Sequence, residues 1–310
     1  MKNVSTAILL VISLFAVPAI AYFFGPTPGE FEWSVLRTLL TITAISIAYT
    51  FIVGELAGNN SQVDKLWSIL PIIYVWVIAY NGDFSLRLVI MAILVTIWGI
   101  RLTVNFAMKG AYQWKFWGGE EDYRWQVLRQ KKEFQPHWKW MLFNLLFICG
   151  YQNVLILLFT LPAIVALQFN VHPMNYFDYI IAGLLFLFIL YETIADIQQW
   201  NFQSKKWKLI KAGEELTGDY KKGFLDKGLW AYSRHPNYFA EQAVWGTFYF
   251  FSVAASGLWL NWTIAGFLLL LILFQGSSNF SEEISAGKYP EYKTYQKNVA
   301  RFLPFPKIRK

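Results

Sequence analysis

The sequence predicts an all-α fold: a polytopic membrane helical bundle of about seven to eight transmembrane helices, with both termini in the cytoplasm. Composition is the first reason. Hydrophobic residues make up 56% of the 310 residues and charged residues 15%, against roughly 25% in a soluble domain. Long apolar stretches are the second reason, since a helix needs about 20 such residues to cross a bilayer. The aromatic content of 19% excludes a disordered chain.

Eight apolar stretches are candidate spans, and they lie at about 4–24, 33–57, 66–81, 85–107, 139–168, 176–200, 237–256 and 257–275. They are continuously apolar rather than alternating, which favours helices over the strands of a barrel. The first stretch also resembles a signal peptide, because Lys2 precedes an apolar run that ends in Ala19-Ile20-Ala21. Cleavage there would leave the orientation of the other spans unchanged.

The basic residues lie in alternate connections. Most lysines and arginines are in the segments 108–138, 201–235 and after residue 276, whereas connections such as 25–32 and 169–175 contain none. With eight spans, the three basic segments fall on one side, which the positive-inside rule assigns to the cytoplasm. They set the topology, and segments of this length could also form a face that holds a polyanionic cofactor.

Ionisable residues at membrane depth are costly, so each is a functional candidate. Glu192 and Asp196 are four residues apart and share one helix face, which Gln199 and Gln203 continue. One interpretation is a stripe of hydrogen-bond acceptors that faces a ligand. The other is a polar helix end that enters the headgroup region.

A second polar face lies in the stretch 85–107, where Trp98, Arg101 and Asn105 recur at helical spacing. Arg101 either contacts a ligand or snorkels to the membrane interface. Asp64 opens the third stretch, where a carboxylate serves either in catalysis or as a plain N-cap.

The segment that enters the seventh stretch, GLWAYSRHPNYFAE, is the richest in polar groups. Pro236 suits the first turn of a helix, and the free N–H groups of that turn can bind phosphate or carboxylate, assisted by Arg234 and His235. Asn237 and Glu241 then step along one helix face. The alternative is an ordinary juxtamembrane anchor of basic and aromatic residues.

Several other classes of site are not expected. The histidines, His137, His172 and His235, lie in different connections, so no metal site is predicted. No Gly-rich dinucleotide motif or Walker motif is present in the sequence. Membrane topology accounts for the net charge of +7, so no nucleic-acid partner is expected. The tail predicts a short amphipathic helix that begins at Glu282 and Glu283.

These motifs resemble the bacterial DUF1295 group of the steroid 5-alpha-reductase family. The resemblance rests on VDKLW, WGIRLTVNF, GEEDYRWQ, ETIADIQQWNF, GLWAYSRHPNYFAE and the ending EEISAGKYPEYKTYQKNVARFLPF. It covers most of 60–305, and the C-terminal third is also similar to sterol C14-reductases and isoprenylcysteine carboxyl methyltransferases. It implies N-terminal transmembrane helices over 1–60 with little family signal, and a reductase-like membrane domain over 61–310 whose cofactor pocket opens to the cytosol.

The resemblance implies an NADPH-dependent oxidoreductase that reduces the C=C bond of an α,β-unsaturated ketone. Its substrate would be a steroid or another enone lipid. The expected catalytic residues are Asp64, Trp98 and Glu241, with a protonated Asp64 as the group that polarises the carbonyl. The expected cofactor-binding residues are Arg101, Asn105, Glu192, Asp196, Lys205 (or its neighbour Lys206), Arg234, His235, Asn237 and Tyr238. The expected location is the bacterial cytoplasmic membrane, among lipids, with the active site facing the cytosol.

Two rival functions remain open. A methyltransferase of the isoprenylcysteine type, which uses S-adenosylmethionine, shares RHP, the tyrosine and a paired glutamate in the tail. Those enzymes usually carry Ser between Pro and Tyr, so Asn237 favours the reductase. A lipid-binding protein without enzymatic activity is the second rival, and it predicts that the polar residues of the spans tolerate alanine.

Overall fold

The structure, a computed structural model, describes residues 2–305, with side chains from residue 8 onward. Every regular element in this part of the chain is a helix, which confirms the all-α prediction. The one β-type contact recorded in it is an isolated bridge between Ser233 and Ala300. The side chain of Lys2, which belongs to the predicted signal-peptide pattern, lies outside the described side chains.

Two compact units make up the chain. The first comprises residues 1–185 and 245–273, and the second comprises residues 186–244 and 274–310. Three long helices pass from one unit into the other: α10 (Tyr176–Lys211), α12 (Pro236–Ser256) and α13 (Ile264–Lys288).

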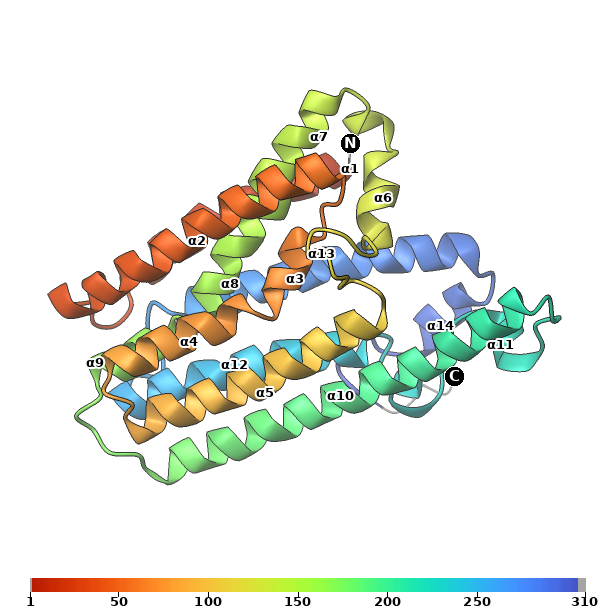
Figure 1. Cartoon of the computed structure of the whole chain (residues 1–310). Helices are drawn as coiled ribbons and strands as arrows, with labels where there is room; N and C mark the ends of the chain where they lie inside the picture. The colour runs from red at the N-terminus through yellow and green to blue at the C-terminus, as the bar shows by residue number, and fades with distance from the viewer. Residues whose placement is uncertain (1, 306–310) are drawn as a thin grey trace. The chain divides into compact units, whose positions relative to one another are not determined.

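The first unit contains most of the helices. In chain order they are α1 (Lys2–Ala21), α2 (Glu30–Ala57), α3 (Gln62–Trp67), α4 (Leu70–Asn81), α5 (Leu86–Met108), α6 (Tyr123–Arg129), the 3-10 turn η1 (Lys132–Phe134), α7 (His137–Phe143), the π-helix η2 (Asn144–Tyr151), α8 (Gln152–Thr160) and α9 (Pro162–Gln168). Within this unit α4 and α5 lie side by side, and α2 packs against η2 and α8 (Figure 1).

Six helices in the described residues are long and apolar enough to cross a membrane, which confirms a polytopic membrane bundle. They cover Glu30–Ala57, Gln62–Asn81, Leu86–Met108, His137–Gln168, Tyr176–Lys211 and Ile264–Lys288. The other two predicted spans are helical but fall outside these six. In α1 the apolar stretch that qualifies is shorter, from Ile8 to Ala21. Helix α12 carries Asn237, Glu241 and Gln242 in its first two turns. The chain is an integral membrane protein.

Two predictions about the C-terminal region are wrong. The last span begins at Ile264 rather than at 257, because α12 ends at Ser256 as predicted but residues 258–263 form a connection, in which Asn261 Oδ1 accepts the backbone N–H of Thr263. Glu282 and Glu283 do not begin a separate tail helix, since α13 continues to Lys288. Pro290 disfavours a helical conformation at the residue before it, so the tail helix starts later, as α14 (Tyr292–Asn298).

The core of the first unit is aromatic and tightly packed. Trp98, Phe159 and Trp245 are almost fully buried, and the ring centroids of Trp245 lie 4.9 Å from Trp98 and 4.0 Å from Phe159. Helix α5 approaches α4 closely at Gly99, where a Cβ atom would stand 2.5 Å from the Ser68 carbonyl oxygen. Small residues at such crossings let membrane helices pack backbone to backbone.

A buried ion pair fixes the connection between α9 and α10 in the same unit. Arg87 Nε donates to Asp178 Oδ1 at 2.7 Å, and both side chains are buried. The Arg87 guanidinium also donates to the carbonyl oxygens of His172 and Pro173, each at 3.0 Å. The charge of Arg87 is thus paired and its donors are hydrogen-bonded, as burial at this depth requires.

The second unit adds the ends of α10, α12 and α13 to three short elements, α11 (Gly218–Lys222), the 3-10 turn η3 (Gly228–Ala231) and α14. Phe224, Tyr292, Tyr295 and Val299 form its aromatic cluster. The Tyr295 hydroxyl donates to the carbonyl oxygens of Trp230 and Ser233. This cluster fastens the C-terminal tail beside the segment that carries Arg234 and His235.

Candidate functional site

The predicted site residues divide between the two units. Asp64, Trp98, Arg101 and Asn105 belong to the first unit. The second unit holds the larger group: Glu192, Asp196, Lys205, Arg234, His235, Asn237, Tyr238 and Glu241.

In the second unit, the polar face of α10 contacts the first turn of α12. Glu192, Asp196 and Gln199 recur at intervals of four and three residues, so they lie along one side of α10. Asn237 Nδ2 donates to Asp196 Oδ1 at 3.2 Å. Two residues from separate sequence motifs are therefore in direct contact.

The Asn237 carboxamide is held at both ends. Its nitrogen donates to Asp196, and its Oδ1 accepts the backbone N–H of Tyr238 at 3.0 Å. The amide nitrogen has two hydrogens, so Asn237 keeps a second donor for another partner. A side chain fixed in this way can present that donor in a single orientation.

Two buried polar atoms on the same helix as Asp196 have no hydrogen-bond partner among the described residues. They are the hydroxyl of Tyr191 and Oε1 of Gln199, both on α10. Buried polar groups in native proteins are nearly always hydrogen-bonded, so these atoms are open to ordered water or to a ligand. Glu192 is also buried on this helix, with 4% of its surface exposed. Helix α10 therefore has polar oxygens for a ligand that carries hydrogen-bond donors, and Gln199 Oε1 shares the face of Asp196.

Arg234 holds the C-terminal tail. Its Nε donates to Glu282 Oε1 at 2.7 Å and its Nη2 to Glu282 Oε2 at 3.2 Å. Its Nη1 donates to the carbonyl oxygens of Gln296, at 2.9 Å, and Val299. These contacts use four of the five guanidinium N–H groups. Its contact with a cofactor phosphate stays a prediction.

His235 is a neutral member of the same cluster. Its Nε2 lies 3.0 Å from Glu282 Oε1, and its ring stacks on Tyr238 with centroids 5.1 Å apart. Burial lowers the pKa of His235 below its usual value of 6.5, and the Glu282 carboxylate opposes this shift. At neutral pH the ring therefore donates a hydrogen bond to Glu282 without carrying a charge.

The two candidate lysines have different surroundings. Lys206 is buried, and its Nζ donates to the Gly223 carbonyl oxygen at 2.9 Å and to the Tyr289 hydroxyl at 3.3 Å. Lys205 is exposed, with Nζ 5.6 Å from the ring centroid of Tyr220. Lys206 thus serves the packing of this unit, and Lys205 is the lysine that can reach an anion. Glu241, the predicted catalytic residue of this unit, is buried on α12.

In the first unit, Asp64 accepts a hydrogen bond from Trp125 Nε1 at 3.0 Å. The N-cap of α3 is Ser61, so the interpretation of Asp64 as an N-cap is wrong. The adjacent Lys65 is fully buried, and its Nζ donates to the carbonyl oxygens of Phe116 and Gly118, each at 2.6 Å. Sequence reasoning missed Trp125 and Lys65 as partners of this site, although both lie within the quoted motifs.

The remaining predicted residues of the first unit follow α5. Trp98 packs in the aromatic core, and Arg101 and Asn105 continue the same helix face at intervals of three and four residues. The Oδ1 atom of Asn105 is buried and has no hydrogen-bond partner in the described part of the chain. Within the described residues, no cluster of three or more His, Cys, Asp or Glu side chains could hold a metal ion.

Comparisons with known proteins place this chain in a family context. Residues 50–299 match a family described as "Protein of unknown function (DUF1295)". A curated relative from Schizosaccharomyces pombe is 37% identical over 288 residues, which cover 84% of this chain and 79% of that protein, and it is itself uncharacterized. No solved structure matches the chain significantly.

Proposed function

Because the chain belongs to the DUF1295 family, which is part of the steroid 5-alpha-reductase-like group, we propose that it is a membrane-embedded reductase that uses NADPH. Its substrate would be the C=C bond of an α,β-unsaturated ketone in a steroid-like lipid. The observation that carries this proposal is the contact between Asp196 and Asn237, together with the unsatisfied buried oxygens on the same helix.

The polar groups of the second unit match the hydrogen-bond donors and acceptors of the dinucleotide. The nicotinamide carboxamide and the ribose hydroxyls carry hydrogen-bond donors, which suit the Tyr191 hydroxyl and Gln199 Oε1. The remaining amide donor of Asn237 suits the carboxamide oxygen of the cofactor. Lys205 would contact a phosphate of the dinucleotide, and Glu192 would accept a hydrogen bond from one of its hydroxyl groups. When bound, NADPH supplies the hydride for the reduction.

The residues of the chain position the reactants and manage the proton. Asp196 and the Tyr238 backbone hold the Asn237 carboxamide, and the Glu282 cluster holds the segment before it. In the protonated form, Asp64 would donate a hydrogen bond to the substrate ketone and stabilise the enolate as it develops. Trp125, which donates to Asp64 Oδ2, would keep that carboxyl group in one orientation.

An activity assay tests this function. Protein purified in detergent, mixed with NADPH and a 3-oxo-Δ4-steroid, is expected to oxidise the cofactor and yield the saturated ketone. Asn237→Ala should abolish turnover, because the fixed amide donor is lost. Asn201→Ala removes an exposed asparagine on the same α10 helix and should leave turnover unchanged. Methyl transfer from S-adenosylmethionine, with no oxidation of NADPH, would favour the methyltransferase instead.

We also propose that the protein lies in a bacterial cytoplasmic membrane with its basic segments in the cytosol. The support is the distribution of charge, since connections such as 25–32 and 169–175 carry no lysine or arginine. Labelling of single cysteines in intact cells would test this orientation. A cysteine at position 115 should be protected from an impermeant reagent, and one at position 171 should react.

A further inference from the structure

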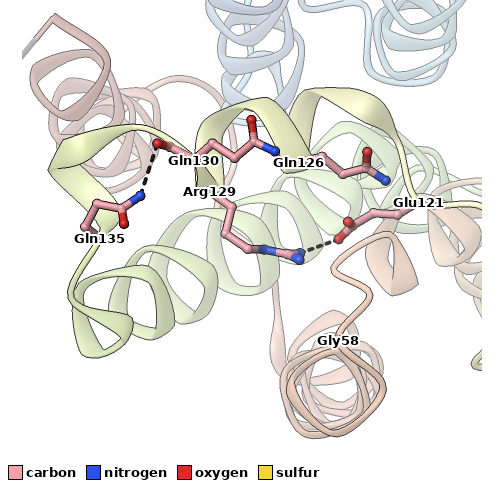
Figure 2. Close-up of a pocket in the computed structure, with 6 residues that line it drawn as sticks. All are labelled: Gly58, Glu121, Gln126, Arg129, Gln130 and Gln135. Carbon is pink, nitrogen blue, oxygen red and sulfur yellow. Dashed lines mark hydrogen bonds and ion pairs between the residues drawn. The ribbon is translucent and has the colours of Figure 1, made fainter.

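A polar hollow opens on the first unit, and none of the residues proposed for the reductase lines it. Its volume is about 570 Å³, and its lining is Gly58, Glu121, Gln126, Arg129, Gln130 and Gln135 (Figure 2). Gly58 directly follows the last residue of the span Glu30–Ala57, and Gln135 precedes the span His137–Gln168 by two residues. The hollow therefore lies beside the ends of two apolar helices, where a membrane-spanning chain meets the lipid head groups.

The charged groups of this hollow form one neutral pair. Arg129 Nη2 donates to Glu121 Oε1 at 2.6 Å and to the side-chain oxygen of Asn60 at 2.5 Å. The same Glu121 oxygen accepts the backbone N–H of Asn60 at 2.8 Å. The pair is thus anchored to the loop after α2, and Figure 2 shows the two side chains pointing toward one another. The net charge of the pair is zero, so a ligand of zero net charge matches it best.

Several donors and acceptors of the lining have no partner in the described part of the chain. The Nε of Arg129 is buried without a hydrogen bond, and no bond is formed by its Nη1. Glu121 Oε2 and the side-chain amides of Gln126 and Gln130 also form no hydrogen bond with these residues, and the two glutamines are exposed, so they can contact a ligand that enters from outside. Buried donors that protein atoms leave unsatisfied are usually met by water or by a ligand. The hollow therefore has a guanidinium donor set and a carboxylate acceptor within one site.

We propose that this hollow binds the head group of a zwitterionic phospholipid that carries a primary ammonium, as in phosphatidylethanolamine. Arg129 and the glutamine amides would donate to the phosphodiester oxygens, and Glu121 would accept from the ammonium. Quaternary ammonium groups are recognised by aromatic rings, and no aromatic residue lines the hollow. A choline head group therefore fits less well, and an anionic head group leaves Glu121 without a partner.

The surroundings of the hollow favour a lipid over a soluble phosphate compound. Trp138 is 63% exposed one residue inside the neighbouring span, and Lys139 follows it. Exposed tryptophan and lysine at a span end are typical of the membrane–water interface. A lipid anchored by its acyl chains also reaches this site at high local concentration, which a soluble head group does not.

Native mass spectrometry of protein extracted from mixed bilayers tests the assignment without any turnover. The bilayers contain equal amounts of phosphatidylethanolamine, phosphatidylglycerol and phosphatidylcholine. We expect phosphatidylethanolamine to be enriched on the wild-type protein. Arg129→Gln and Glu121→Gln should each reduce that enrichment about tenfold, since each removes a charge-assisted hydrogen bond. Lys132→Gln removes an exposed charge from the same loop and should leave the enrichment unchanged.

A second kind of variant tests the proposal without breaking the ion pair, so that the test still holds if the ion-pair variants misfold. Gln126 is exposed, so Gln126→Trp should fill the hollow without disturbing the core, and should also lower the enrichment. Equal enrichment in wild-type and Gln126→Trp protein would overturn the proposal. So would a preference of the wild-type protein for phosphatidylglycerol or phosphatidylcholine. Displacement of the lipid by an equal concentration of free O-phosphoethanolamine would overturn the choice of a lipid.

Discussion

The Glu282 carboxylate forms several hydrogen bonds that the sequence around it does not predict. Its carboxylate accepts from Arg234, His235 and Gln296, and its side chain is 4% exposed. Arg234 and His235 lie in the segment before α12 and Gln296 lies in the tail, so this carboxylate joins the end of α13 to both of these parts of the second unit. A buried charge with partners on two segments contributes to stability only while its partners are present.

Removing this carboxylate should therefore destabilise the protein strongly. Glu282→Ala leaves the Arg234 guanidinium buried without its counter-ion, which typically costs about 3–5 kcal/mol. We expect a lower apparent melting temperature in detergent and earlier proteolysis of the tail. Glu283→Ala, at the exposed neighbouring position, is the control and should melt like wild type. Equal melting of both variants would show that the ion pair does not hold the tail.

The stability of the same cluster should depend on pH through His235. Burial lowers the pKa of His235 below 6.5; Glu282 raises it, and Arg234 and Arg301 lower it. The unfolded chain therefore binds this proton at a higher pH than the folded chain does. The stability from this group is fully present above pH 6.5 and is lost as the pH falls through the folded-state pKa. In His235→Gln protein, the melting temperature should fall less steeply as the pH is lowered below 6.5. If the slope is the same as in wild type, groups other than His235 cause the pH dependence.

At the scale of elements, close packing between helices determines which side chains fit at a crossing. The approach of α5 to α4 depends on the missing side chain of Gly99, since a Cβ atom there would meet the Ser68 oxygen and the Ile72 side chain. The Ser68 oxygen is a backbone atom of a buried residue, so it cannot move aside as the end of the partly buried Ile72 side chain can. Glycine at this crossing is thus a packing requirement rather than a source of flexibility.

Substitution of this glycine should separate α4 from α5. Gly99→Ala is expected to lower stability by about 1–3 kcal/mol through overpacking. Gly183→Ala on α10 is the matched control, because no atom lies within 4 Å of a Cβ placed there. The control should melt at or slightly above the wild-type temperature, since alanine is the better helix former. Equal melting temperatures of the two variants would contradict a close crossing at Gly99.

Apolar length alone predicted most of the elements, and local backbone chemistry explains where it failed. The stretch 139–168 is one apolar run in sequence, yet it contains the π-helix Asn144–Tyr151. Hydropathy does not distinguish a π-helix from an α-helix. Its first residue, Asn144, donates to Glu55 Oε1 at 2.6 Å on α2, a partner that no local pattern names. The break after Ser256 agrees with the prediction, whereas the connection 258–263 is rich in Leu and Trp, so hydropathy alone counts it as part of the next span.

At the scale of the whole molecule, sequence motifs identified candidate residues but not their partners. Asp196 and Asn237 were each singled out, whereas the hydrogen bond between them joins positions 41 residues apart and depends on the packing of α10 and α12. Trp125 and Lys65 were overlooked, because a tryptophan in a polar loop and a lysine at a helix start both have ordinary explanations. Their burial against Asp64 and two backbone carbonyls comes from the fold.

The proposed reductase also predicts which nucleotide stabilises the molecule. NADPH at a concentration well above its Kd should raise the melting temperature, because it binds the folded state alone. S-adenosylmethionine should not raise it. The opposite result would favour the methyltransferase, and a shift with neither compound would favour a lipid-binding protein.

Direct binding of NADPH is the measurement closest to the central claim. Titration of purified protein, followed by NADPH fluorescence, should give saturable binding to wild type and to Asn201→Ala. Asp196→Ala and Asn237→Ala should each weaken binding about tenfold or more, and the double variant should be little worse than either single one, because the two side chains act through one shared hydrogen bond. Wild-type protein that does not bind NADPH, or binding that both variants leave intact, would contradict the assignment of this face of α10 as the cofactor site.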